Sequence, residues 1–281
     1  MNTDSYFQIG TPHISAGKPA QDYAFSYSED DVAWVVLSDG CSSGDKTDVG
    51  ARLVTLSTAN IIHQLWQAKG NQDFESRQQE VLENQNKALN QVKNALSLNM
   101  RDMLATCLFA QATPSRAYIH VQGDGVIALK YKTGKVIVHR FEWNRNAPYY
   151  PIYSADNQLS EFRKLQQISN SDVCVSQETW VIDNDSVNLL SNQGHTLQQG
   201  IEGISLQFSD DEIEDLEFIA LFSDGITQIK NTSWLEAIKI FLAYKNTRGE
   251  FVKRRCIRGI KNLNKNGHIL LDDFSCAVIK L

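Results

Sequence analysis

The order of apolar and polar residues divides the first hundred residues into strand-like and helix-like segments. Residues 32–37 (Val-Ala-Trp-Val-Val-Leu) are continuously apolar, which is typical of a strand buried on both faces, and they lead into Ser38-Asp39-Gly40. Residues 48–68 and 76–98 carry apolar positions at near-helical spacing. This pattern predicts two amphipathic helices joined by a polar turn at residues 70–73.

After residue 100 the pattern changes to short β-type runs separated by turn residues. A helix is expected to begin at Thr232 or Ser233 and to continue through Leu242, and a last helix at about residues 250–263. Paired helices among hairpin-joined strands indicate an α+β fold, with helices packed outside a sheet or a pair of sheets, and residues 1–281 read as one domain. The predicted strands are residues 104–110, 117–121, 126–131, 135–141, 179–182, 203–208, 217–222 and 274–281.

The composition is that of an ordinary water-soluble globular protein, with 42% apolar and 21% charged residues. Lysines and arginines number 27 against 33 aspartates and glutamates, so the formal net charge is 27 − 33 = −6, which argues against a general nucleic-acid-binding function. The five cysteines are scattered and form no Cys-x-x-Cys pair, as expected in a reducing compartment. No signal peptide and no apolar run of about 18 residues is visible, so we expect a cytoplasmic protein without a membrane anchor.

Carboxylates lie where predicted core strands begin or end. Asp39 and Asp224 each follow a core strand and precede a glycine, Asp124 lies between two glycines, and Asp272 and Asp273 precede the last strand. Burying a carboxylate at the end of a core strand is costly without a partner, and that partner is often a metal ion. Mg²⁺ and Mn²⁺ prefer oxygen ligands, so these strand ends would form a metal site if they converged at one sheet edge.

The same residues also have a simpler interpretation. Asp-Gly is a common turn dipeptide, and any single example is more often a turn than a metal ligand. Two copies of Ser-Asp-Gly after apolar strands, together with the other acidic strand ends, are harder to explain as turns alone. The spacing by itself leaves both interpretations open.

Seven short motifs follow one another between residues 21 and 275. They are Gln21-Asp22, Ser38-Asp39-Gly40, Val49-Gly50-Ala51, Ala105-Thr106-Cys107, Gly123-Asp124-Gly125, Phe222-Ser223-Asp224-Gly225-Ile226 and Asp272-Asp273-Phe274-Ser275. This set resembles the metal-dependent protein phosphatases of the 2C type. His13 followed by Gly-Lys-Pro-x-Gln-Asp at residues 17–22 is similar to the bacterial branch of that family. Each motif alone is weak, but together they span nearly the whole chain in the family's order.

The resemblance implies a four-layer αββα sandwich, in which two mainly antiparallel sheets are flanked by helix pairs. It also implies two Mg²⁺ or Mn²⁺ ions per chain, with a third ion held more weakly. Asp39 matches the family's carboxylate that bridges the two ions, and the Gly40 carbonyl matches a ligand of the second ion. Asp224 and Asp272 match the other ligands of the first ion, and Asp124 matches a ligand of the third.

The activity implied by the resemblance is hydrolysis of phosphoserine and phosphothreonine in proteins, by direct attack of a metal-bridging hydroxide. Asp22 matches an acid that orients bound water, so Asp39, Asp224, Asp272 and Asp22 are the residues expected to carry catalysis. The implied partners are a phosphorylated protein substrate and a cognate serine/threonine kinase. Neither nucleic acid nor a membrane is expected as a partner, and a monomer is expected.

Three positions depart from the family's usual pattern. Gln21 stands where a glutamate usually contacts the second ion, so that ion is expected to bind more weakly or through water. Gly17 stands where many members have a phosphate-binding arginine, which leaves Lys18 or His13 as phosphate-binding candidates, although lysine offers a point charge rather than a bidentate fork. Cys41 stands where animal members have a histidine that is thought to act as general acid.

Two other functions fit parts of the sequence. Loss of the usual glutamate and arginine would suit a pseudophosphatase that binds phosphoproteins without turnover. Residues 40–44 also spell the Gly-x-Ser-x-Gly elbow of serine hydrolases, with Ser42 as nucleophile and with Asp224 and His268 following in the required order. Such an elbow should lead directly into a helix and belong to a mostly parallel sheet, and neither is predicted here.

The last predicted helix carries a cluster of positive charge opposite an apolar side formed by Val252, Cys256 and Ile260. Such a cluster is usually a solvated face, and the alternative is a docking surface for an acidic phosphoprotein or a kinase tail. The basic cluster consists of Lys253, Arg254, Arg255, Arg258, Lys261 and Lys265.

Residues 142–170 show no clear pattern of apolar and polar positions.

Overall fold

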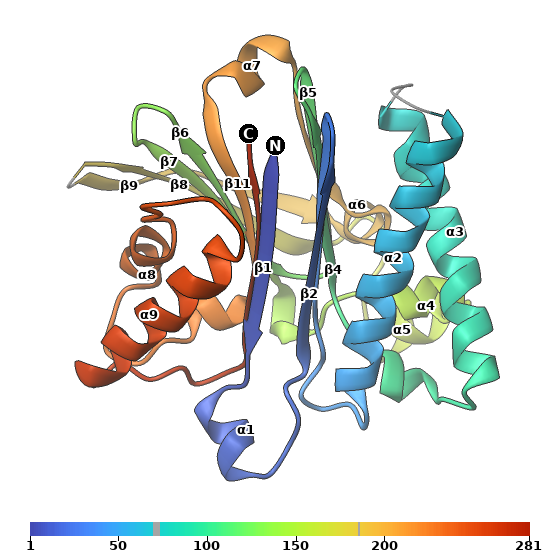
Figure 1. Cartoon of the computed structure of the whole chain (residues 1–281). Coiled ribbons are helices and arrows are strands. Elements are labelled where there is room, and N and C mark those ends of the chain that lie inside the picture. The colour runs from blue at the N-terminus through green and yellow to red at the C-terminus, as the bar shows by residue number, and fades with distance from the viewer. Residues whose placement is uncertain (70–73, 185) are drawn as a thin grey trace.

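Two β-sheets lie face to face between two groups of helices in this protein (Figure 1). The arrangement comes from a computed structural model, which describes residues 1–69, 74–184 and 186–281. It confirms the α+β class and the αββα order of layers. The polar turn predicted at residues 70–73 lies outside the described residues. Among the described helices, none combines the length and the apolar composition needed to cross a lipid bilayer.

One sheet has seven antiparallel strands in the order β1-β12-β11-β6-β7-β8-β9. Its last strand in the sequence, β12, lies between β1 and β11, so segments from the two ends of the chain are neighbours (Figure 1). The strands are β1 (Asn2–Gln8), β6 (Gly125–Tyr131), β7 (Val136–Trp143), β8 (Val173–Asp183), β9 (Ser186–Thr196), β11 (Leu216–Phe222) and β12 (Phe274–Lys280).

The other sheet has five antiparallel strands in the order β10-β5-β4-β3-β2. Its central strands bury both faces, which explains the continuous apolar run at residues 32–37. Trp34 and Val36 of β3 pack toward the helices, whereas Val35 and Leu37 pack between the two sheets. The strands are β2 (Asp22–Glu29), β3 (Val32–Asp39), β4 (Cys107–Thr113), β5 (Arg116–Gln122) and β10 (Ile204–Phe208).

Two helix pairs form the outer layers, as predicted (Figure 1). Helices α2 (Thr47–Lys69) and α3 (Phe74–Ala95) cover the five-stranded sheet. Helices α8 (Trp234–Phe241) and α9 (Phe251–Lys265) cover the seven-stranded sheet. Ser233 is the N-cap residue of α8, one of the two positions expected from the sequence.

The unpatterned residues 142–170 form the end of β7 and two short helices around a small separate core, to which Trp143, Tyr149 and Phe162 contribute. The pattern of apolar residues did not predict β1, β2 and β9. All three are edge strands, and an edge strand has no continuous apolar run because part of its surface faces water. The short helices are α1 (Thr11–Ser15), α4 (Pro151–Ala155), α5 (Leu159–Gln166), α6 (Leu197–Glu202) and α7 (Asp210–Glu214).

Candidate metal centre

Five aspartates gather at one end of the sandwich, because antiparallel pairing aligns the ends of the strands that carry them. Asp39, the last residue of β3, lies directly opposite Asp22, the first residue of β2. Asp224 follows β11, Asp272 precedes β12 and Asp124 precedes β6, and these three strands are antiparallel neighbours. The charges of Asp224 and Asp124 both act on Asp39, so the two sheets contribute to one cluster.

Burial and the charges of neighbouring carboxylates raise the pKa values of Asp22, Asp39 and Asp124. Burial, with the charge of Asp273 adding to it, raises the pKa of Asp22 to about 8. Burial and the charge of Asp224 raise the pKa of Asp124 to about 8. Burial, followed by the charges of Asp22 and Asp224, raises the pKa of Asp39 well above its ordinary value. The cluster is therefore short of positive charge.

The oxygen donors of the cluster fit divalent cations. Both carboxylate oxygens of Asp22 and the Oε1 of Gln21 are buried and accept no hydrogen bond from the described residues. Burial and the charge of Asp224 also raise the pKa of Asp272. Unpaired oxygens around a deficit of positive charge are the environment that Mg²⁺ and Mn²⁺ occupy in proteins.

Gly40 adds a backbone carbonyl to these donors. A Cβ at position 40 would lie 2.6 Å from the carbonyl oxygen of Thr47 and 2.8 Å from that of Gln21, so only glycine fits between the two segments. The Gly40 amide donates to the Gln21 carbonyl at 3.1 Å. No hydrogen bond from the described residues reaches the Gly40 carbonyl, which leaves this oxygen available to a cation.

A short chain of hydrogen bonds orients the Gln21 amide. Its Nε2 donates to the Thr47 hydroxyl at 2.7 Å, and this hydroxyl donates to the Cys41 carbonyl at 3.0 Å. With Nε2 fixed in this way, the amide oxygen of Gln21 is the atom left without a partner. Gln21 therefore offers a neutral oxygen ligand, where the family that the sequence motifs resemble usually has a carboxylate.

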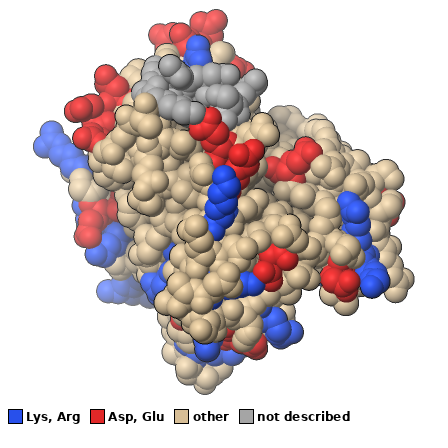
Figure 2. Space-filling view, turned by 90° about the vertical axis from the view of Figure 1, so that its right-hand side faces the viewer, with Lys and Arg blue, Asp and Glu red and all other residues tan. Residues whose placement is uncertain are grey.

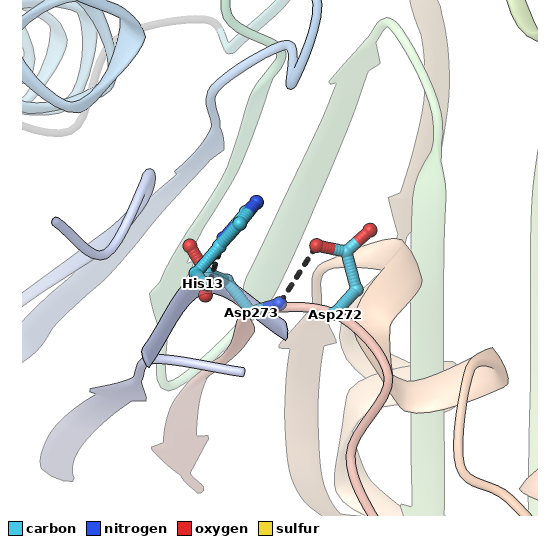
Figure 3. Close-up of side chains that lie close together, drawn as sticks. All are labelled: His13, Asp272 and Asp273. Carbon is cyan, nitrogen blue, oxygen red and sulfur yellow. Dashed lines mark hydrogen bonds and ion pairs between the residues drawn. The ribbon is translucent and has the colours of Figure 1, made fainter. Parts of the chain in front are cut away.

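Asp273 connects three segments of the N-terminal region to the last strand, a role that the sequence analysis missed. Its two oxygens accept from the amides of Gly10 at 2.6 Å and Gln21 at 2.5 Å. His13 Nδ1 lies 3.0 Å from Asp273 Oδ1, and ligand atoms of His13, Asp272 and Asp273 all lie within 4.8 Å of one another (Figure 3). The sequence shows only two adjacent acids, Asp272 and Asp273. Their spacing does not indicate which is the candidate metal ligand and which connects the segments.

Gln228 was also missed as a site residue. Its Nε2 donates to Asp224 at 2.8 Å and to Asp272 at 3.1 Å, so one amide group holds the two carboxylates side by side. Asp272 also accepts from the amide of Asp273 at 2.8 Å (Figure 3). A glutamine four residues after Asp224 carries no recognisable signal in the sequence.

A cleft of about 580 Å³ opens beside the cluster and is lined by both Asp124 and Asp224. Arg140 and Arg145 line the same cleft. Arg140 forms ion pairs with two glutamates, whereas Arg145 donates one hydrogen bond, at 3.3 Å, to the carbonyl of Gln166. Arg145 is therefore the less neutralised of the two cations in this cleft.

The two phosphate-binding candidates from the sequence are placed differently. His13 lies against Asp273 and Asp272 and is largely buried. Lys18 is exposed, and only its backbone amide makes a described contact, with the carbonyl of His13 at 3.0 Å. Neither residue lines the cleft beside Asp124 and Asp224.

The serine hydrolase interpretation does not fit the structure. Ser42 lies in a loop between β3 and α2, and both sheets are antiparallel. In the part of the chain that the structure describes, no hydrogen bond joins Ser42, Asp224 and His268. The Gly-x-Ser-x-Gly pattern at residues 40–44 is therefore a loop beside the carboxylate cluster.

A family model described as protein phosphatase 2C matches residues 9–254. The chain belongs to the protein phosphatase 2C family. No curated protein sequence matches this protein phosphatase 2C chain.

Several solved structures share the fold of this chain at low sequence identity. The serine/threonine phosphatase Stp1 from Staphylococcus aureus is 12% identical, with a TM-score of 0.56, over 100% of this chain and 95% of its own. A bacterial serine phosphatase is 12% identical, with a TM-score of 0.57, over 99% and 96%. A sex-determining protein from C. elegans is 12% identical, with a TM-score of 0.54, over 99% and 64%. At these identities the likeness establishes the fold of this protein phosphatase 2C chain.

Proposed function

We propose that this member of the protein phosphatase 2C family is a catalytically active protein-serine/threonine phosphatase that depends on Mg²⁺ or Mn²⁺. The observation that carries the proposal is the buried carboxylate cluster, whose raised pKa values and unpaired oxygens call for cations. Its substrate would be a phosphorylated protein, the product of a serine/threonine kinase.

The residues that would hold two cations are Asp39, the Gly40 carbonyl, Asp224 and Asp272, with Gln21 as a neutral ligand. Asp124 would hold a third ion more weakly. Divalent cations in this position supply hydroxide near neutral pH, because they lower the pKa of water bound to them. Three aspartates neutralise three of the four charges on two divalent ions, and the remaining positive charge attracts a phosphate dianion.

The remaining residues would position these groups. Asp22, opposite Asp39, would accept a proton or a hydrogen bond from water beside the cluster, because both of its oxygens are unpaired. Gln228 would keep Asp224 and Asp272 together through its two hydrogen bonds. Arg145 would bind the phosphate of the substrate from across the cleft, since Gly17 cannot.

The test is release of phosphate from a phosphothreonine peptide with Mn²⁺, with EDTA, and in the Asp224→Asn variant. We expect turnover that EDTA and Asp224→Asn both abolish. Asp183→Asn, a matched change at an exposed residue in the β8–β9 hairpin, should leave the rate unchanged. Turnover that persists in EDTA or in Asp224→Asn would contradict the proposal.

Gln21 and Gly17 favour a second candidate function, that of a pseudophosphatase. They stand where a negatively charged metal ligand and a phosphate-binding arginine are usual in the family. A pseudophosphatase would bind the phosphothreonine peptide and release no phosphate from it. Binding of the peptide with no turnover at any Mn²⁺ concentration would select this alternative over the active enzyme.

A further inference from the structure

A cavity of about 680 Å³ lies between α9 and the segment that follows α8. It shares no lining residue with the cleft beside the carboxylate cluster. Helix α9 packs its apolar side, with Val252, Cys256 and Ile260, against the seven-stranded sheet. The cavity is therefore on the opposite, polar side of this helix. Figure 1 shows α9 on the outer face of that sheet.

Five cations and no acidic residue line this cavity. Among the residues that the structure describes, none of these five side chains takes part in an ion pair. The nearest ion pair on α9 joins Lys253 to Glu250, and neither residue lines the cavity. The five cations are Lys245, Arg248, Arg254, Arg255 and Arg258.

The protein holds two of these cations in place without neutralising them. Arg255 Nε donates to the carbonyl of Ile240 at 2.5 Å, and Arg254 Nη2 donates to the carbonyl of Arg248 at 2.7 Å. A neutral carbonyl leaves the full charge on each guanidinium group, and no other hydrogen bond from either group is found among the described residues. Such pre-ordered guanidinium groups bind carboxylates and phosphates with little further loss of side-chain entropy.

The floor of the cavity is aromatic. Tyr244 and Phe251 both line it, with their rings 5.0 Å apart in an edge-to-face contact. The Tyr244 hydroxyl is buried on the core side, near Cys276 and Cys256, so the cavity offers the aromatic rings and not this hydroxyl. A ligand that brings some apolar surface would pack against this floor.

Repulsion among the five cations of the cavity destabilises the protein unless negative charge compensates for it. Arg254 and Arg258 are four residues apart on one helix, a spacing at which like charges destabilise the helix by a few tenths of a kcal/mol. The protein as a whole carries a net charge of −6. On the face formed by α2 and α3, acidic and basic side chains are interspersed instead (Figure 2). The cavity is thus a local concentration of uncompensated positive charge.

We propose that this cavity binds an acidic segment of a partner protein, whose aspartate, glutamate or phosphorylated side chains pair with the five cations. The cavity is larger than a single phosphate needs, and its aromatic floor suits the side chains of a peptide. The net negative charge of the protein opposes long-range attraction of a nucleic acid or an anionic membrane. The proposal does not depend on turnover at the carboxylate cluster.

The test is fluorescence anisotropy of a labelled acidic peptide, with its Glu→Gln counterpart as the neutral probe. Arg254 and Arg258 are exposed, so the double variant Arg254→Gln/Arg258→Gln should fold, which thermal unfolding checks. The matched control is Arg116→Gln/Lys132→Gln, which removes the same charge at exposed hairpin positions. A DNA oligonucleotide and vesicles that contain an anionic lipid are the competing probes.

We expect the wild type and the control to bind the acidic peptide. The Arg254→Gln/Arg258→Gln variant should bind it at least about tenfold more weakly, because it loses two charge-assisted contacts. Binding should weaken as salt is added, and the neutral peptide should not bind. Equal losses in the two double variants would overturn the proposal, as would tighter binding of DNA or vesicles. Peptide binding and phosphatase activity are measured separately, so either can fail alone.

Discussion

Asp22 and Asp39 are a directly opposed cross-strand pair, at the first residue of β2 and the last residue of β3. Like charges at such a position destabilise a sheet, and the charge of Asp22 is among the causes that raise the pKa of Asp39. A cation beside the pair would remove this repulsion. Stability of the fold and occupation of the candidate metal centre should therefore depend on each other.

The variant Asp39→Asn tests this dependence. Without metal, we expect it to melt about 2–4 °C higher than the wild type, because about 1 kcal/mol of repulsion is removed. Mn²⁺ should raise the melting temperature of the wild type. At a concentration a hundredfold above the dissociation constant, binding adds about 2.7 kcal/mol to the free energy of unfolding. Mn²⁺ should leave Asp39→Asn nearly unchanged.

Thermal unfolding in EDTA and in Mn²⁺ measures both effects. The exposed Asp183→Asn variant serves as the control and should follow the wild type in both buffers. A full Mn²⁺ response in Asp39→Asn would show that Asp39 is no ligand.

The neutral ligand at position 21 allows a gain-of-affinity experiment. We expect Gln21→Glu to bind Mn²⁺ about tenfold more tightly, because a carboxylate replaces an amide oxygen in a site short of negative ligands for its second ion. Part of this gain is offset by loss of the Nε2 hydrogen bond to Thr47. Isothermal titration with Mn²⁺ measures the change, with Gln79→Glu on the exposed side of α3 as the control for charge. An unchanged affinity would place Gln21 outside the ion's reach.

Arg145 should influence substrate binding more than chemistry. It lines the cleft with Asp124 and Asp224 and makes no described ion pair. We expect Arg145→Gln to raise KM for a phosphothreonine peptide about tenfold and to lower kcat much less, because a charge-assisted contact to phosphate is lost. Steady-state kinetics of this variant and of Arg116→Gln provide the comparison. A lower kcat at unchanged KM would assign Arg145 to the transition state instead.

A buried histidine on β5, outside the carboxylate cluster, predicts the acid sensitivity of the fold. Burial lowers the pKa of His120 to about 3, and its Nδ1 lies 3.0 Å from the Ser205 hydroxyl. In the unfolded chain this group takes up a proton near pH 6.5, whereas in the folded protein it stays neutral down to about pH 3. Its contribution is therefore fully present above pH 6.5 and is lost as the pH falls.

The size of this loss is about 2–3 kcal/mol between pH 7 and pH 4.5, because over this range the unfolded chain takes up a proton at His120 and the folded protein does not. Urea unfolding of the wild type and of His120→Gln across this range measures it. The free energy of unfolding of His120→Gln should fall less steeply with acid, whatever its value at pH 7. Parallel curves for the two proteins would rule out His120 as the source.

The apolar pattern predicted the centre of the fold and the strand ends of the site, but not its outer parts. Asp39 and Asp224 follow runs whose side chains alternate between two cores, so the sequence marks both the strand and its end. Edge strands such as β9 carry no such mark, because one side is open to water.

The missed site residues depend on contacts between distant segments. Asp273 reaches the amides of Gly10 and Gln21, which are more than two hundred positions away in the sequence. Gln228 is an ordinary polar residue until β11 and β12 bring Asp224 and Asp272 within reach of its amide. Local spacing cannot specify such contacts, since they exist only after the sheets have formed.

The position of β12 between β1 and β11 has a consequence for synthesis of the protein. Strand β12 separates β1 from β11, so β1 cannot join the seven-stranded sheet until residues 274–280 have left the ribosome. Until then β1 has no partner in this sheet, and neither Asp272 nor Asp273 is available to the site. The candidate metal centre therefore cannot be completed before residues 272–280 have been synthesised, however early the other strands pair.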